Sequence, residues 1–183
     1  MRRRFFPACV WAAFILLVCV GSGLAVAGSS EDLIQAVGAG DLPRVQKLLA
    51  EGASPDSRNE EGVTALALAA GAPDTAILQA LIGAKASLEA RDSKGNTALM
   101  FAAEAGRYEA ARLLLDAGAE VDALEWQKAS PLMCAAQYGY DDVIFLLVER
   151  GADVNRKAAQ GVTALDIAKQ NNQELTVDLL ENG

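Results

Sequence analysis

Residues 91–124, which read RDSKGNTALMFAAEAGRYEAARLLLDAGAEVDAL, contain the pattern that decides the fold expected for this chain. A polar turn leads to Thr97, which is placed to cap an apolar helix over residues 98–105. After a glycine, a second helical run covers residues 108–117, and a short hairpin follows it. Neither helix can bury its apolar face alone, so we expect neighbouring units of the same kind.

The same pattern recurs at intervals of 33 residues on both sides of this stretch. In the second to fifth units, a small hydroxyl side chain leads the first helix: Thr64, Thr97, Ser130 and Thr163. A leucine follows two positions later in each of these four units, and a fixed period of this size predicts a solenoid of stacked repeats. We expect one repeat domain over residues 28–183, with units at 29–58, 59–91, 92–124, 125–157 and 158–183.

These units resemble the ankyrin-repeat family, whose unit is about 33 residues long. The resemblance is carried by DSKGNTALMFAA and LLLDAGAEVD in the third unit, ASPLMCAAQYGYDD in the fourth and QGVTALDIA in the fifth. It implies an all-α ankyrin-repeat solenoid of about five helix-turn-helix units with short β-hairpin loops. A tetratricopeptide array is the rival interpretation, but it requires a period of about 34 residues and a different aromatic pattern.

The chain departs from the family pattern because it contains no histidine. The family phrase TPLH is replaced in turn by TALA, TALM, SPLM and TALD, so that Ala67, Met100, Met133 and Asp166 stand in the histidine position. The hydrogen bond that the family forms between this histidine and the threonine is therefore absent. We expect Met100 and Met133 to fill the space as adaptable apolar groups.

The second unit is irregular at two positions. Pro73 stands where the third unit has a glycine, so the first helix of this unit is expected to end by Gly71. Lys85 stands where other units have the glycine that ends the second helix, which predicts a positive φ for this lysine. The same reasoning applies to Lys128, which occupies the hairpin glycine position of the fourth unit.

Residues 1–27 have the pattern of an export signal. Three arginines at residues 2–4 precede an apolar stretch over residues 8–20, and Ala25 and Ala27 form a cleavage site for a signal peptidase. We expect cleavage after Ala27 and a periplasmic or secreted protein, by the general secretory or the twin-arginine route. The alternative is a membrane anchor, because residues 8–27 are about long enough to span a bilayer.

Charge and cysteine content exclude several classes of function. Removing the three arginines of the signal lowers the formal charge from −8 to −11, which disfavours nucleic acid as a partner. Cys134 is the single cysteine after residue 27, so no intramolecular disulfide is expected, and its apolar neighbours predict a buried side chain. The absence of histidine, of a glycine-rich phosphate loop and of metal-ligand spacing argues against an enzyme, a cofactor or a bound metal.

The family resemblance implies a non-catalytic module that binds a protein partner on its concave face, and we expect a monomer. Two alternatives stay open: an inhibitor or immunity-type protein directed at one exported enzyme, and a membrane-anchored scaffold. The fourth unit carries Trp126 and Tyr138 at positions where the fold requires no aromatic side chain. The predicted protein-binding residues are Trp126, Tyr138, Tyr140, Tyr108, Glu104, Asn96, Gln160 and Gln170. The aromatic side chains could instead cover neighbouring apolar surface.

Overall fold

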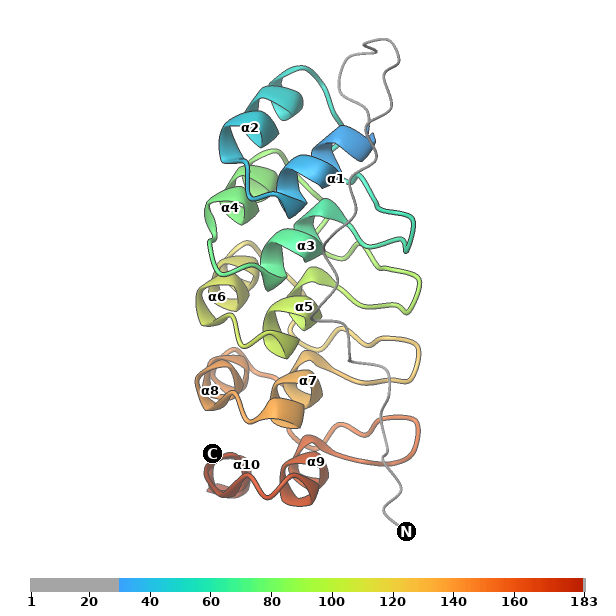
Figure 1. The fold of residues 1–183 in the computed structure, drawn as a ribbon. Helices are drawn as coiled ribbons and strands as arrows, with labels where there is room; N and C mark the ends of the chain where they lie inside the picture. Colours follow the sequence, from blue (N-terminus) through green and yellow to red (C-terminus); the bar gives the residue numbers. More distant parts are fainter. Residues whose placement is uncertain (1–29, 183) are drawn as a thin grey trace.

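The computed structural model describes residues 30–182, which form a stack of paired helices (Figure 1). Over these residues the helices are α1 (Ser30–Gly38), α2 (Leu42–Ala50), α3 (Ala65–Gly71), α4 (Ala76–Gly83), α5 (Ala98–Glu104), α6 (Tyr108–Asp116), α7 (Pro131–Tyr138), α8 (Asp141–Glu149), α9 (Ala164–Gln170) and α10 (Glu174–Asn182). The predicted signal peptide, residues 1–27, and its cleavage site lie outside the described residues.

The helices form two layers, as the repeat pattern predicts. The odd-numbered helices stack in one layer and the even-numbered helices in the other, and each pair contacts the next along the stack (Figure 1). The hairpin loops project from the side of the odd-numbered helices, away from the even-numbered layer (Figure 1). The predicted all-α repeat solenoid is confirmed.

The hairpin loops differ from the prediction because they contain almost no strand. In the described part of the chain, the pair Arg58 and Thr64 forms an isolated antiparallel bridge. The third hairpin closes with two backbone hydrogen bonds, from the Asp92 amide to the Asn96 carbonyl at 3.0 Å and from the Gly95 amide to the Asp92 carbonyl at 3.1 Å. The helix begins two residues after Asn96, so the hairpin arms are too short for a ladder of paired residues.

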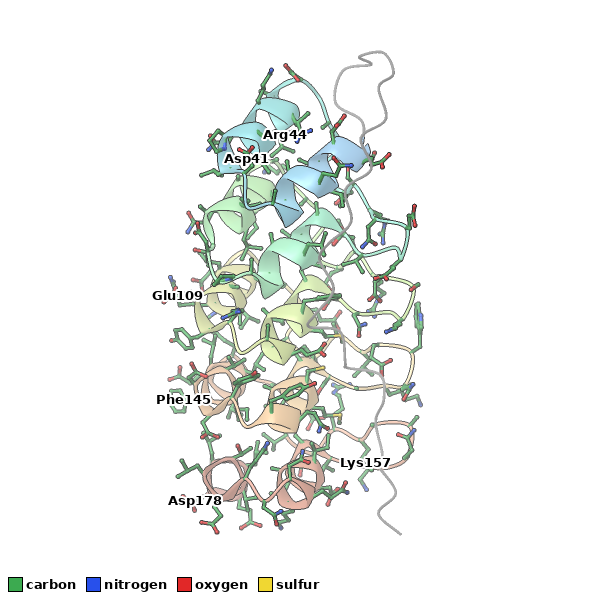
Figure 2. All side chains as sticks on the ribbon, viewed as in Figure 1. Asp41, Arg44, Glu109, Phe145, Lys157 and Asp178 are labelled. Atoms are coloured by element: carbon green, nitrogen blue, oxygen red, sulfur yellow. The ribbon has the colours of Figure 1, made fainter. Side chains whose placement is uncertain are left out.

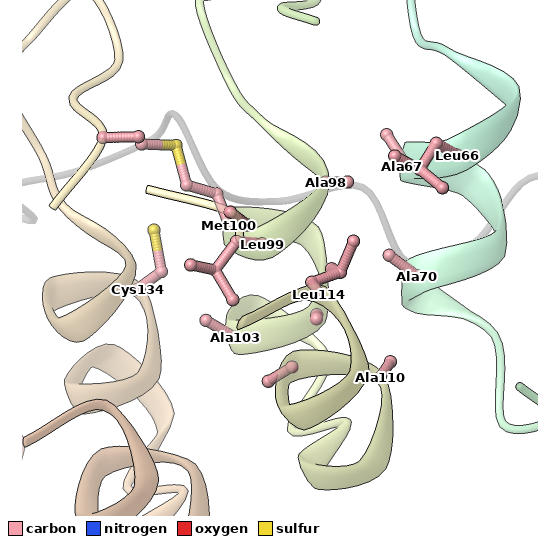
Figure 3. Close-up of a cluster of buried hydrophobic side chains, with 14 of the residues drawn as sticks. Leu66, Ala67, Ala70, Ala98, Leu99, Met100, Ala103, Ala110, Leu114 and Cys134 are labelled. Carbon is pink, nitrogen blue, oxygen red and sulfur yellow. The ribbon is translucent and has the colours of Figure 1, made fainter. Parts of the chain in front are cut away.

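The core between the layers is built from leucine and alanine at repeating positions (Figure 3). Leu99 and Ala103 of α5 are fully buried together with Leu114 of α6. Alanine on the inner helices lets adjacent repeats approach closely, and large apolar side chains are buried on both layers, including Leu66, Leu99 and Leu132 of the inner helices and Leu78, Leu114 and Leu147 of the outer helices. Cys134 is 3% exposed on α7, which confirms the prediction of a buried thiol.

Hydroxyl caps begin three of the inner helices but not the helix for which the cap was first predicted. The hydroxyls of Thr64, Ser130 and Thr163 each accept a hydrogen bond from the amide three residues on. Thr97 occupies the N-cap position of α5, but its hydroxyl forms no cap hydrogen bond. This oxygen is buried without a hydrogen-bond partner among the described residues, so the predicted capping role of the Thr97 hydroxyl is wrong.

The irregular positions behave as predicted. Helix α3 ends at Gly71, two residues before Pro73. Lys85 has a φ of 66° and Lys128 a φ of 63°, so both lysines adopt the left-handed conformation that glycine adopts most easily.

Carboxylates at one repeating position join each repeat to the next, a feature that the sequence analysis missed. The side chains of Asp56, Glu89 and Asp122 accept hydrogen bonds from backbone amides 31 residues further on. The distances are 2.7 Å to the Ser87 amide and 2.8 Å to the Glu120 amide. Because these acceptors are 33 residues apart, the same bond recurs along the stack and fixes the spacing of the hairpins.

Candidate protein-binding surface

The predicted binding residues fall into two groups at opposite ends of the inner helices. Asn96, Trp126 and Gln160 lie in the hairpins that precede α5, α7 and α9. The other group lies where the inner helices end and the outer helices begin: Glu104, Tyr108, Tyr138, Tyr140 and Gln170. A helix of eight residues such as α7 separates the two groups by about 12 Å. A partner that contacts both groups must therefore span the length of the inner helices.

Trp126 is an exposed side chain with a fixed orientation. The residue is 65% exposed, yet its indole Nε1 donates a hydrogen bond to the Ser93 carbonyl at 3.0 Å. The ring packs so closely on the preceding hairpin that a Cβ at Gly95 would lie 2.8 Å from it. The Arg91 guanidinium lies 5.9 Å from the ring centroid. The indole therefore presents a large apolar surface to solvent without rotational freedom.

Tyr138 and Tyr140 form an aromatic pair at the other end of α7. Their ring centroids are 5.9 Å apart and the ring planes are inclined by 33°. Tyr138 is 43% exposed, whereas Tyr140 is partly buried against the core. The pair gives the fourth repeat a second aromatic surface, opposite Trp126 along the helix.

Tyr140 also has a packing role. A Cβ built on Gly106 would lie 2.6 Å from the Tyr140 ring, so this ring covers the end of the preceding repeat. The residues 33 positions before and after Tyr140 also contact the end of the preceding inner helix. Arg107 donates to the Gly71 carbonyl, and Gln173 lies against Gly139. The aromatic side chains were expected either to bind a partner or to cover neighbouring apolar surface. The Tyr140 ring covers neighbouring surface.

Glu104 is the most strongly perturbed carboxyl group of the predicted surface. Burial at the end of α5 raises its pKa to about 7, with the Lys94 charge lowering the pKa and the Asp92 charge raising it. The equivalent positions of the next two repeats are Gln137 and Gln170, which carry no charge. Glu104 therefore loses its charge near neutral pH, at a position where the other repeats are neutral at all pH values.

The remaining predicted residues differ in how much they contact the rest of the protein. The Asn96 side chain donates to the Asp92 carboxylate at 3.0 Å and so supports its own hairpin. Tyr108 is partly buried against the core at the start of α6. Gln160 and Gln170 are exposed in the fifth repeat.

Two exposed apolar side chains were not predicted. Phe145 of α8 is 53% exposed and Leu175 of α10 is 75% exposed. Figure 2 shows Phe145 on the outer layer, on the side of the molecule opposite Lys157 and the hairpins. The sequence held a signal for it, because the equivalent positions of the adjacent repeats are the charged Arg112 and Asp178.

Among residues 30–182, no three acidic, cysteine or histidine side chains are grouped so that they could hold a metal ion. Over the same part of the chain, no helix combines the length and apolar character that crossing a bilayer requires.

Comparison with known families agrees with the geometry. The family model for ankyrin repeats (3 copies) matches residues 33–125 and 120–183. The two matches together extend over most of the chain, which therefore belongs to the ankyrin-repeat family. Proteins of this family are generally non-catalytic modules for protein–protein interaction. Comparison with curated proteins finds no match to this chain.

Proposed function

We propose that this protein is an exported, non-catalytic ankyrin-repeat module that binds a protein partner on its concave face, with the site centred on the fourth repeat. The inner helices and hairpins supply the surface, and Trp126 and Tyr138 supply its apolar anchors. Glu104, Tyr108, Tyr140, Asn96, Gln160 and Gln170 surround these anchors.

The observation that carries this proposal is the state of Trp126. The indole is 65% exposed, yet a hydrogen bond to the Ser93 carbonyl and packing against Gly95 already orient it in the unbound protein. Covering it with a partner releases water at little further cost in conformational entropy, which favours tight binding. Tryptophan and tyrosine are also the residues most often found at energetic centres of interfaces.

The test is capture of the partner from an exported protein extract by immobilised variants, followed by affinity measurement on the captured protein. Trp126→Ala and Tyr138→Ala should each weaken binding by about 2 kcal/mol or more. Phe145→Ala is the matched control, because it removes an exposed aromatic ring from the opposite side of the molecule. Full retention of the partner by both binding variants, with loss in Phe145→Ala, would move the site to the outer layer.

Export rests on residues 1–27, for which we propose cleavage after Ala27. Determining the N-terminal sequence of the protein purified from cells tests this, and a start at Gly28 in a soluble extract is the expected result. Protein that still begins at Met1 and is found in the membrane fraction would instead show that the N-terminal segment is an uncleaved membrane anchor. The partner then decides between a scaffold and an inhibitor: an exported enzyme that loses activity when the array is added identifies an inhibitor.

A further inference from the structure

The tips of successive hairpins form one continuous edge of the molecule, here called the tip row. Backbone hydrogen bonds join its members, from the Trp126 amide to the Lys94 carbonyl at 3.2 Å and from the Ala159 amide to the Gln127 carbonyl at 2.8 Å. These bonds join the third, fourth and fifth hairpins, and the second hairpin packs on the third, because a Cβ built on Gly62 would lie 3.3 Å from the Ser93 amide nitrogen. Its charged and aromatic residues are Glu60, Glu61, Lys94, Trp126, Lys128 and Lys157.

Charge is separated along the tip row. The second hairpin contributes the two glutamates, the third contributes Lys94 and the fourth contributes Lys128, while Lys157 is the last residue of the fourth repeat and leads into the fifth hairpin. All five charged residues are exposed, and none of them forms a salt bridge within residues 30–182. Figure 2 shows Lys157 beside the loop that precedes α9, away from the helices of the outer layer.

The carboxylates closest to these lysines in sequence are used inside the hairpins. Asp92 is 8% exposed and accepts from the amides of Lys94 and Asn96, both at 2.8 Å. Glu125 accepts from the amides of Gln127 and Ala129. The three lysines are exposed, as is Trp126, on a chain that is acidic as a whole. The carboxylates that sense these charges are Glu104 and Asp166. Burial raises the pKa of Glu104 and the Lys94 charge lowers it. Hydrogen bonds from Thr163 lower the pKa of Asp166, and the Lys157 charge lowers it further.

We propose that the tip row binds an extended acidic segment of the partner protein, which identifies the chemistry of the partner and rests on the function proposed above. The carboxylates of this segment lie against Lys94, Lys128 and Lys157, and an apolar side chain covers Trp126. A basic residue at one end of the segment faces Glu60 and Glu61, so the charge pattern also sets the direction of the bound chain.

The spacing of the repeats predicts the spacing of the acidic residues. Helices packed side by side lie about 8–10 Å apart, and an extended chain rises about 3.3 Å per residue. One carboxylate per repeat therefore corresponds to about every third residue of the bound segment. Backbone hydrogen bonds between hairpins, such as that from the Trp126 amide to the Lys94 carbonyl, hold the hairpin backbones in place beforehand, which reduces the entropy lost on binding.

An acidic protein segment fits the tip row better than nucleic acid. Lysines beside an exposed indole also suit a single strand, in which bases stack on aromatic rings. However, Glu60 and Glu61 end the row with negative charge, and the formal charge after removal of the signal is −11. Both features repel a uniformly charged phosphate backbone, whereas a segment of mixed charge matches them.

The test uses purified protein and fluorescent peptides, with binding followed by anisotropy. The probe is a peptide of about twelve residues with glutamate at every third position, one leucine in the middle and lysine at one end. The comparison peptides carry lysine in place of glutamate, or the same residues with the glutamates contiguous. A single-stranded oligonucleotide of similar length is the third comparison. We expect the spaced acidic peptide to bind best and its affinity to fall as salt increases.

Charge reversal locates the site. Lys94→Glu and Lys128→Glu should each weaken binding of the spaced acidic peptide about tenfold or more. Lys85→Glu is the matched control for Lys128→Glu, because both lysines are exposed and have positive φ, at 66° and 63°. It should leave binding unchanged, since Lys85 follows an outer helix and lies outside the tip row.

Equal or better binding of the lysine peptide or the oligonucleotide, or no binding of any peptide, would overturn the acidic-segment proposal. An equal loss in Lys85→Glu would overturn it as well. These outcomes are separable from failure of the proposed function. If Trp126→Ala loses the captured partner while Lys94→Glu and Lys128→Glu retain it, the binding surface stands and only the acidic chemistry is wrong.

Discussion

Thr163 and Asp166 cap each other at the start of α9. The Asp166 carboxylate accepts from the Thr163 amide at 2.9 Å and from the Thr163 hydroxyl at 2.8 Å, while the Asp166 amide donates to that hydroxyl. Asp166 stands where the family has histidine, so in the fifth repeat a carboxylate replaces the missing hydrogen-bond partner. In the third repeat that position is Met100, which gives the Thr97 hydroxyl no strong acceptor.

The contrast predicts opposite effects of one substitution at two equivalent positions. Thr97→Val should leave the free energy of unfolding unchanged or increase it, because the buried hydroxyl has no partner to lose. Thr64→Val should lower it by about 1 kcal/mol, since the Thr64 hydroxyl accepts from the Ala67 amide at 3.1 Å. Urea denaturation of both variants measures the difference. Equal destabilisation would mean that the Thr97 hydroxyl does form a cap in solution.

Asp166 itself should make stability depend on acid. Its pKa is lowered by the hydrogen bonds from Thr163, so the folded state favours the charged carboxylate more than the unfolded state does. The contribution is therefore present above the unfolded pKa and is lost as the pH falls through the folded pKa. Asp166→Ala should reduce this loss on acidification while lowering stability at neutral pH. Hydrogen exchange in α9, compared between pH 7 and acid, is the measurement.

Glu104 should act in the opposite direction. Burial raises its pKa from 4.5 to about 7, so the folded state binds more protons than the unfolded state between these values. Stability must then fall as the pH rises through this window and stay level above it. Glu104→Gln should remove the slope and raise stability at pH 8 by on the order of 2 kcal/mol. Gln137→Glu is the reciprocal change, and it should create such a slope if the two positions are equivalent.

The positive φ of Lys85 predicts a stabilising change to glycine. A lysine pays a steric penalty in this conformation that glycine avoids, so Lys85→Gly should raise the free energy of unfolding by about 1 kcal/mol. The urea midpoint should increase with no change in the slope of the transition. Lys47→Gly, inside α2, should lower the midpoint instead. A decrease in Lys85→Gly would show that the lysine side chain stabilises this turn by more than its backbone conformation costs.

Substitution of a core residue should lower the free energy of unfolding more than substitution of a surface residue does. Leu114 is fully buried, and Leu114→Ala should lower the free energy of unfolding by about 2–5 kcal/mol. Trp126→Ala removes one hydrogen bond and a partly exposed ring, which should cost about 1 kcal/mol. Thermal and urea unfolding of the two variants test this. If Trp126→Ala unfolds the array as readily as Leu114→Ala does, Trp126 belongs to the structural framework.

The fold could be predicted from the sequence because each repeat carries the same local pattern of helix caps, apolar positions and turn residues. Gly71 and Lys85 could be placed correctly, since helix ends depend on residues within one turn of the chain. The contacts of Trp126 could not, because its partners Ser93 and Gly95 belong to the preceding hairpin and are identified only by the packing of one repeat on the next. The state of the Thr97 hydroxyl was equally hidden, since it depends on the absence of any hydrogen-bond partner for this oxygen in the folded structure.

The carboxylate bonds that join successive hairpins have a consequence for how disturbances travel. Asp122 holds the amide of Asp153 in the next repeat, and the bonds of this type in the described chain all reach one repeat forward. In such a linear lattice each unit senses only its immediate neighbours. Opening of the first repeat should thus decay before it reaches Trp126, so that the array can fray at its amino-terminal end while the hairpin that carries Trp126 stays assembled.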